Sequence, residues 1–199
     1  MKVNFQTSVG VATGTSPMCM HACGMIRNMN NIILIGMPAS GKSTAGVILA
    51  KVLGKGFVDT DLVIQQRENA RLCDIIEERG IEGFLECEKE AVLSIKTENS
   101  VIATGGSVVY SSDAMNYLSG LGRIIYLKVE KELLFKRLRD IHQRGVVLKD
   151  GETPDEMYEN RKLLYEKYAD NVIDEGKLSI EETVCRITDL IKEAQHGIN

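Results

Sequence analysis

The stretch IILIGMPASGKST, residues 32–44, decides the fold of this chain. Its first five residues form an apolar run that is typical of a strand covered on both faces. From Gly36 to Ser43 it matches the pattern G-x-x-x-x-G-K-[ST], and a helical pattern follows from Lys42 to Leu53. Glycines let the backbone curl so that successive N–H groups face an anion, and the amino end of the helix adds its dipole. The stretch therefore predicts a binding site for a nucleoside triphosphate.

The side chains of this loop have separate expected roles. Lys42 would reach the β- and γ-phosphates of a nucleotide, and Ser43 would place its hydroxyl on Mg²⁺. We expect nucleotide contacts all along the loop, at Gly36, Ala39, Ser40, Gly41, Lys42, Ser43 and Thr44. The alternative is a glycine-rich turn with a capping serine, and the strand before the pattern and the helix after it both disfavour this alternative.

Outside this stretch, short apolar runs alternate with longer helical patterns. Strands are expected at residues 32–36, 56–59, 101–104, 123–128 and 171–174. Helices are expected at residues 42–53, 73–79, 81–97, 112–118, 130–141, 153–168 and 180–194. Such alternation predicts a three-layer α/β/α fold, with a mostly parallel sheet between the helices. We expect one P-loop NTPase domain over residues 31–199, without an internal repeat or a linker to a second domain.

The composition excludes several classes of protein. The chain has 199 residues, of which 44% are hydrophobic and 26% are charged, enough for one substantial core. With 24 Lys and Arg against 28 Asp and Glu, a broad basic surface for nucleic acid is not expected. No apolar run approaches the roughly 18 residues of a membrane span. The five cysteines are odd in number and scattered, which favours a reducing cytoplasm over a disulfide framework.

Residues 1–30 differ from the rest of the chain. They hold no Asp or Glu and show neither helical nor strand periodicity, so we expect a disordered extension. No apolar core of about 7–15 residues follows Lys2, which disfavours a secretory signal, and a transit peptide would be richer in Arg. A start site assigned too early, with the true initiator at Met25 or Met29, would also explain the segment.

Two acidic residues and two glycines lie at strand ends where a ligand would bind. Asp59 and Asp61 end the second expected strand, and Gly105 and Gly106 follow the third. One carboxylate could hold metal-bound water, and the other could accept a hydrogen bond from an attacking hydroxyl. The alternatives are a helix cap at Asp61 and a tight turn at the two glycines. The sequence has no NKxD-like signature and no arginine-finger module, so phosphoryl transfer to a metabolite is favoured over a switch GTPase or a motor.

Several motifs resemble those of the shikimate kinase family in order and spacing. They are GMPASGKST at Gly36–Thr44, FVDTD at Phe57–Asp61, Phe84 with Glu88, ATGG at Ala103–Gly106, and Arg161, Leu164, Tyr165, Ala169 and Asp170. The resemblance covers residues 31–195. It implies a single domain with a five-stranded parallel sheet and a mobile lid. It also implies phosphorylation of the 3-hydroxyl of shikimate by ATP and Mg²⁺, a reaction of aromatic amino acid biosynthesis.

The resemblance assigns the donor side residue by residue. Lys42 and Ser43 match the phosphate and metal ligands, and Asp59 matches the acid on the metal side. Arg137 falls where the family places an arginine beside adenine. Arg144 falls in the expected lid, residues 142–158, from which it would reach the transferring phosphate.

The resemblance also assigns the acceptor side. Asp61 matches the acid that holds the substrate hydroxyls, and Arg161 matches an arginine that grips the substrate carboxylate. The same pocket is expected to be lined by Glu88, Gly105 and Gly106. We therefore expect Lys42, Asp61 and Arg144 to be the catalytic residues of a monomeric enzyme that acts on a small-molecule acceptor.

Three positions depart from the family pattern. Leu85 stands where the family has a second arginine for the carboxylate, Ser107 replaces the third glycine of T-G-G-G, and Arg144-Gly-Val-Val replaces R-P-L-L. Losing one of two charge-assisted clamps costs about 2–4 kcal/mol. Either another cation substitutes, or the acceptor is a different hydroxylated metabolite such as a gluconate-like acid. The candidate cations are Arg67, Arg71 and Lys89. A nucleotide-binding regulatory protein without turnover is the third alternative, against which the intact loop and acids argue.

Overall fold

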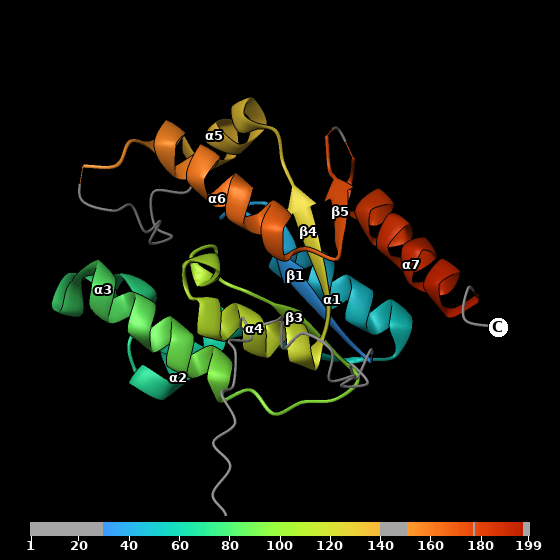
Figure 1. Ribbon diagram of the computed structural model, residues 1–199, viewed down its shortest axis with the longest axis horizontal. Helices are drawn as coiled ribbons and strands as arrows, with labels where there is room; N and C mark the ends of the chain where they lie inside the picture. Colours follow the sequence, from blue (N-terminus) through green and yellow to red (C-terminus); the bar gives the residue numbers. More distant parts are fainter. Residues whose placement is uncertain (1–29, 140–150, 177, 197–199) are drawn as a thin grey trace, which may run out of the picture.

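A five-stranded parallel sheet lies at the centre of the computed structural model, which describes residues 30–139, 151–176 and 178–196 (Figure 1). The strands are β1 (Asn31–Ile35), β2 (Gly56–Asp59), β3 (Ser100–Ala103), β4 (Gly122–Lys128) and β5 (Asn171–Asp174). Their order across the sheet is β2-β3-β1-β4-β5, and every neighbouring pair is parallel. The expected strands are therefore confirmed, and their ends differ from expectation by one residue at most.

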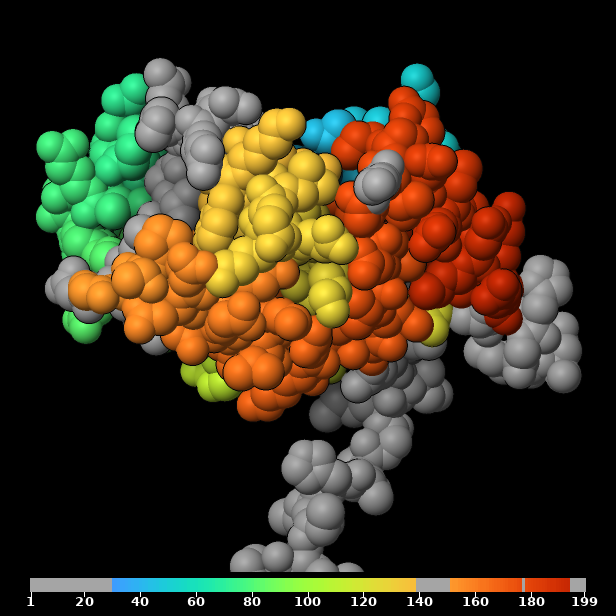
Figure 2. All heavy atoms as spheres, turned by 90° about the horizontal axis from the view of Figure 1, so that it is seen from above, coloured from blue at the N-terminus to red at the C-terminus, as the bar shows by residue number. Residues whose placement is uncertain are grey.

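The helices of the described residues alternate with these strands along the chain. They are α1 (Lys42–Leu53), α2 (Thr60–Glu68), α3 (Leu72–Leu93), the 3₁₀ turn η1 (Val108–Tyr110), α4 (Ser112–Leu121), α5 (Lys131–Arg139), α6 (Pro154–Tyr168) and α7 (Ile180–His196). Seen from above, α5 and α6 lie between α3 on one side and α7 on the other (Figure 2).

Both faces of the sheet are covered, because the side chains of β1 alternate between two apolar clusters. Ile32 and Leu34 pack in a cluster with residues of α1 and α7. Ile33 and Ile35 point the other way, into a larger cluster with residues of α4, α5 and α6 (Figure 1). The expected three-layer α/β/α fold is thus confirmed.

Two helices show what the sequence pattern misses and what it captures. The pattern does not predict α2, because only Thr60 and Ile64 of this helix are buried and no apolar stripe results. The expected break near residue 80 is confirmed, since Gly80 has a φ of 69° and divides α3 into two helical parts. The second part ends at Leu93, earlier than expected, and leaves a connection of six residues to β3.

The expected lid is wrong at its carboxyl-terminal end. Residues 140–150, which include Arg144, lie outside the described part of the chain. Residues 154–158, however, form the first turn of α6, and part of this turn is buried in the core. A capping box, in which Thr153 and Glu156 exchange hydrogen bonds, fixes the start of the helix. The capping box starts the helix at this point, and the buried side chains of Met157 and Tyr158 make the segment part of the core.

Asn31 fixes the amino-terminal edge of the sheet, opposite the phosphate loop. Its buried side chain donates to the carbonyls of Thr97 and Leu121 and accepts from the amide of Ser100.

Residues 1–29, which carry the expected extension, lie outside the described part. Within the described ranges, no helix is both long enough and apolar enough to cross a membrane.

Candidate active site

The loop between β1 and α1 encloses the ammonium group of Lys42. Lys42 Nζ donates to the carbonyl oxygens of Gly36 at 2.8 Å and Met37 at 2.7 Å, and it lies 3.3 Å from Ser40 Oγ. Gly41 starts α1 with a φ of 88°, which turns the chain from the loop into the helix. The loop therefore has the curled form that the sequence predicts, with its cation at the centre.

The electrostatic environment of Lys42 is unusual for a lysine. Burial lowers the pKa of Lys42 to about 8, while the carboxylates of Asp61, Glu175 and Asp59 act in the opposite direction. Only 7% of this residue is exposed. A phosphate or other anion bound in the loop would therefore stabilise the Lys42 ammonium, which is poorly solvated.

Asp59 is the last residue of β2, and Asp61 lies two residues further on, at the same edge of the sheet. Asp59 Oδ1 accepts a hydrogen bond of 3.0 Å from the amide of Asp61, and Asp59 is thereby the N-cap of α2. The alternative of a cap at Asp61 is wrong, because Asp61 lies inside the first turn of the helix. The Asp61 side chain therefore does not cap α2, and its carboxylate acts electrostatically on Lys42.

The oxygen ligands expected for Mg²⁺ fit the chemistry of that ion. The described residues contain no group of three or more His, Cys, Asp or Glu side chains that could hold a metal. Mg²⁺ needs no such group, since it is commonly held by one or two carboxylates together with water and substrate phosphates. Ser43 is exposed in the first turn of α1, and Asp59 is half-buried and close enough to Lys42 to affect its pKa. Both are hard oxygen donors.

The turn after β3 brings a third carboxylate into the site. A side chain at Gly105 would collide with Glu88 Oε1 and would come within 3.0 Å of Asp61 Oδ1, so the two carboxylates lie directly against this turn. The amide of Gly105 donates to Thr60 Oγ1 at 2.9 Å, which ties this turn to α2. Asp61, Gly105 and Glu88 are thus brought together, as the sequence predicts.

Glu88 carries an uncommon proton affinity for a glutamate. Burial raises the pKa of Glu88 to about 7, although a hydrogen bond from Ser107 opposes the shift. Asp61 adds to the increase, while Arg161 and Lys42 reduce it. Glu88 Oε1 is buried and has no hydrogen-bond partner within the described residues. A group that donates a hydrogen bond, such as a hydroxyl of a bound acceptor, would satisfy this oxygen.

Arg161 lies in α6 with only 1% of its surface exposed. Its Nε donates to the Tyr110 hydroxyl at 3.2 Å, and its guanidinium lies 5.1 Å from the centre of the Tyr110 ring. Tyr165, one turn further along α6, donates to the carbonyl of Gly106 at 2.6 Å. A single helix therefore holds both the arginine and the turn after β3 in place.

A cavity of about 340 Å³ continues the site between α3, η1 and the start of α4. Its lining includes Leu85, Glu88, Lys89, Ser107 and Tyr110. The three candidate cations for the substrate carboxylate differ in their position relative to this cavity. Arg67 pairs with Glu90 and Arg71 pairs with Asp74 on exposed surfaces, whereas Lys89 lines the cavity and pairs with Glu86 at 2.6 Å.

On the other side of the loop, Arg137 of α5 reaches across to the phosphate loop. Its Nη1 donates to the carbonyl of Ala39 at 3.3 Å and lies 3.5 Å from Glu175 Oε2. Glu175 belongs to none of the sequence motifs and is not predicted as a site residue. The signal that could have found it is its position directly after β5, because ligands bind at the carboxyl ends of parallel strands.

Comparison with known proteins decides the family. The model of the family described as shikimate kinase matches residues 38–192. The chain belongs to the shikimate kinase family. A shikimate kinase of Histophilus somni is 36% identical over 166 residues, which are 81% of this chain and 94% of that protein. One of Clostridium botulinum is 40% identical over 143 residues, which are 70% of this chain and 84% of that protein.

Solved structures agree with this membership. The shikimate kinase from Acinetobacter baumannii, solved in complex with shikimate, superposes with a TM-score of 0.74 at 26% identity. The match covers 85% of this chain and 96% of that one. The resemblance noted in the sequence is thus confirmed, and the five-stranded parallel fold is that of the shikimate kinase family.

The protonation of Glu88 leads to a prediction about stability. In the unfolded chain this carboxyl ionises near its ordinary pKa of 4.5, and in the folded chain only near 7. Below the lower value both states are protonated; as pH rises through the window between the two values, the folded state loses stability relative to the unfolded state. Glu88→Gln, which is neutral at any pH, should therefore stabilise the protein more at about pH 8 than at about pH 5.

Thermal unfolding midpoints of both proteins at the two pH values measure this difference. Glu82→Gln is the matched control, because Glu82 lies exposed on the same helix. Its midpoint should follow that of the unsubstituted protein at both pH values. A Glu88→Gln difference that is equal at the two pH values would contradict the prediction.

Proposed function

We propose that this chain transfers the γ-phosphoryl group of ATP to the 3-hydroxyl of shikimate. The observation that carries the proposal is the meeting, at one sheet edge, of the enclosed Lys42 ammonium with a pocket formed by Asp61, Glu88 and Arg161. Together with family membership, this pairing of a phosphate loop and an acid-binding pocket supports a kinase for a small polyhydroxy acid.

On the donor side, the chain binds and orients the nucleotide. Loop amides and Lys42 bind the phosphates, and Lys42 stabilises the charge that develops on the transferring group. Ser43 and Asp59 would hold Mg²⁺, which would neutralise negative charge on the nucleotide phosphates. Arg137 flanks the base of the nucleotide. Arg144, which lies outside the described residues, is proposed to reach the phosphates from a closing lid.

On the acceptor side, Asp61 accepts a hydrogen bond from the attacking hydroxyl and orients its oxygen towards the phosphate loop. Arg161 binds the substrate carboxylate, and its contacts with Tyr110 fix its guanidinium before the acceptor arrives. Glu88 accepts from a second hydroxyl through its unpartnered oxygen. These roles divide the substrate into a carboxylate end and a hydroxyl end.

Residues 31–199 are proposed to form a single kinase domain, with residues 1–30 as a disordered extension. The scattered cysteines support a cytoplasmic enzyme, and the acidic net charge of −4 supports the absence of a nucleic-acid partner. We propose a monomer with two small-molecule substrates.

A second candidate acceptor class rests on Leu85 and Ser107, two side chains that line the cavity beside Glu88. An apolar and a hydroxyl group there suit a hydroxylated acid that differs from shikimate.

Measurement of ADP release with shikimate, gluconate, homoserine and nucleoside monophosphates separates the candidate acceptors, with Lys42→Ala as the inactive control. We expect shikimate to give the highest kcat/KM. ATP binding without stimulation by any acceptor would instead indicate a nucleotide-binding regulatory protein.

Asp61→Asn tests the acceptor-side role. It should lower kcat roughly 100-fold or more, the usual effect of losing a positioned proton acceptor, with little change in ATP affinity. Steady-state kinetics and nucleotide titration measure the two effects. Asp189→Asn, at an exposed position of α7, is the control and should behave like the unsubstituted enzyme. Unaltered turnover of Asp61→Asn would limit Asp61 to a structural part in α2.

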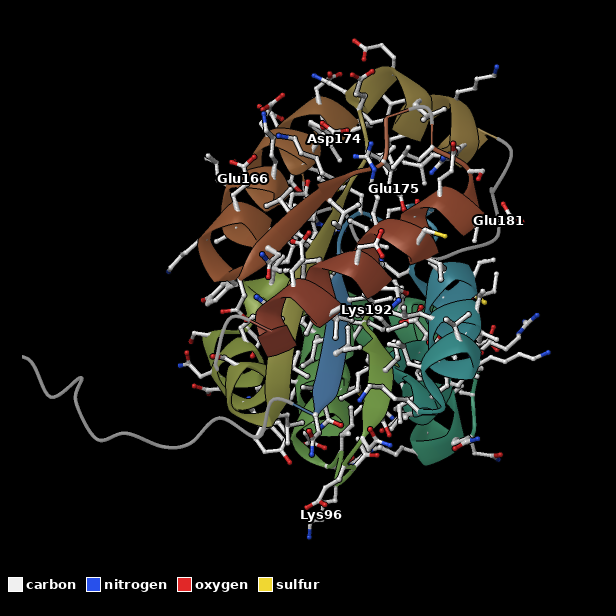
Figure 3. All side chains as sticks on the ribbon, turned by 90° about the vertical axis from the view of Figure 1, so that its right-hand side faces the viewer. Lys96, Glu166, Asp174, Glu175, Glu181 and Lys192 are labelled. Carbon is white, nitrogen blue, oxygen red and sulfur yellow. The ribbon has the colours of Figure 1, made fainter. Side chains whose placement is uncertain are left out.

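Lys89→Met tests whether this lysine supplies the second cation for the substrate carboxylate. Loss of one charge-assisted hydrogen bond should raise KM for shikimate roughly 10-fold or more and leave KM for ATP unaltered. Lys96→Met is the control, because Lys96 is exposed at the opposite end of the sheet (Figure 3). An unchanged KM for shikimate in Lys89→Met would leave Arg161 as the cation that binds the carboxylate.

A further inference from the structure

Glu175 is a buried carboxylate that the proposed mechanism does not use. Only 2% of its surface is exposed, and its Oε1 has no hydrogen-bond partner in the described parts of the chain. A buried carboxylate with an unpartnered oxygen destabilises a folded protein unless nearby cations compensate for its charge. The position of Glu175 therefore calls for an explanation beyond packing.

The backbone holds Glu175 at the nucleotide side of the sheet edge. Its amide donates to the carbonyl of Lys128 at 2.8 Å, which extends the pairing of β4 and β5 by one residue. Figure 3 shows Glu175 next to Asp174, just past the end of β5. Its Oε1 lies 3.9 Å from the point that a Cβ on Gly41 would occupy. The carboxylate thus adjoins the phosphate loop.

Arg137 links this carboxylate to the loop. Arg137 Nη1 lies 3.5 Å from Glu175 Oε2 and donates to the carbonyl of Ala39 at 3.3 Å. The Arg137 side chain is about one-third exposed, whereas the Glu175 side chain is almost fully buried. Glu175 therefore supplies a fixed anchor from inside the protein for a cation that reaches the surface at the rim of the loop.

We propose that Glu175 is a positioning residue for the nucleotide, which acts by holding the Arg137 guanidinium at the rim of the phosphate loop before the nucleotide binds. The inference rests on the proposed use of ATP. Arginine has many rotamers, and ordering it only upon binding would weaken the complex. Because Glu175 holds the Arg137 side chain in the apoprotein, the nucleotide binds to a guanidinium that is already ordered.

The charges around Glu175 agree with this role. Burial raises the pKa of Glu175, and Arg137 and Lys42 oppose that shift because both favour the ionised carboxylate. Both cations face the nucleotide site. The buried charge of Glu175 lowers the stability of the fold, and in this position it orders Arg137, a side chain proposed to bind the nucleotide.

Glu175→Gln keeps the shape of the side chain and removes its charge. It should weaken ADP binding roughly three- to tenfold and raise KM for ATP by a similar factor, because a charge-assisted contact becomes a neutral one. KM for shikimate should stay unchanged. The thermal unfolding midpoint should change little, since removal of the buried charge offsets the lost attraction to Arg137 and Lys42. A merely structural residue would give a lower midpoint and altered constants for both substrates.

A double-mutant cycle tests whether Glu175 acts through Arg137. Arg137→Met should weaken ADP binding on its own, and adding Glu175→Gln to it should cause no further loss. Calorimetric titration with ADP measures all four proteins without any need for an acceptor. Glu181→Gln is the matched control, because Glu181 is exposed near the start of α7 and its loss changes the net charge equally (Figure 3).

Unweakened ADP binding by Glu175→Gln would overturn the inference, as would losses that add fully in the double mutant. These outcomes differ from failure of the proposed function. If the unsubstituted protein phosphorylates shikimate and Glu175→Gln binds ADP normally, only the role of Glu175 is wrong. If the unsubstituted protein transfers no phosphoryl group to shikimate and Glu175→Gln still weakens ADP binding, only the proposed acceptor is wrong.

Discussion

Parallel strands must all end at the same edge of their sheet, and the whole site depends on this constraint. Because β1 is central, the phosphate loop that follows it has neighbours on both sides. β2 and β3 carry the chain to Asp61 and Gly105 on one side, and β5 carries it to Glu175 on the other. The strand order therefore separates two groups of contacts: the proposed acceptor pocket lies towards β2, and the contacts of Arg137 lie towards β5.

Burial of charge is the second organising feature. Lys42, Glu88, Arg161 and Glu175 are all nearly inaccessible to solvent, and burial is the largest cause of the pKa shift of Lys42, Glu88 and Glu175. Such groups interact strongly because little water screens them. They are also fixed in place before a ligand arrives, which is the arrangement that stabilises developing charge most effectively. Two carboxylate oxygens of this network, Glu88 Oε1 and Glu175 Oε1, have no hydrogen-bond partner among the described residues.

Much of this site could be predicted from the sequence, because its signals are local. The loop at residues 36–43 carries its geometry in its glycines, and the buried strands are continuous apolar runs. Other features depend on tertiary contacts. Asp59 caps a helix, α2, whose polar sequence gives no apolar stripe. Glu175 belongs to no motif, and its importance follows only from its burial and from Arg137, which is far away in sequence.

The turn after β3 and the phosphate loop touch so closely that a side chain at Gly106 would come within 2.7 Å of the Pro38 ring. Tyr165 holds the other side of the turn through the Gly106 carbonyl. The proposed donor and acceptor sites therefore share this contact, and a larger side chain at Gly106 would displace the Pro38 ring of the phosphate loop. Leu85 and Ser107, which depart from the motif pattern of the family, line the cavity beside α3 and η1, so a different acceptor would be accommodated by changes there.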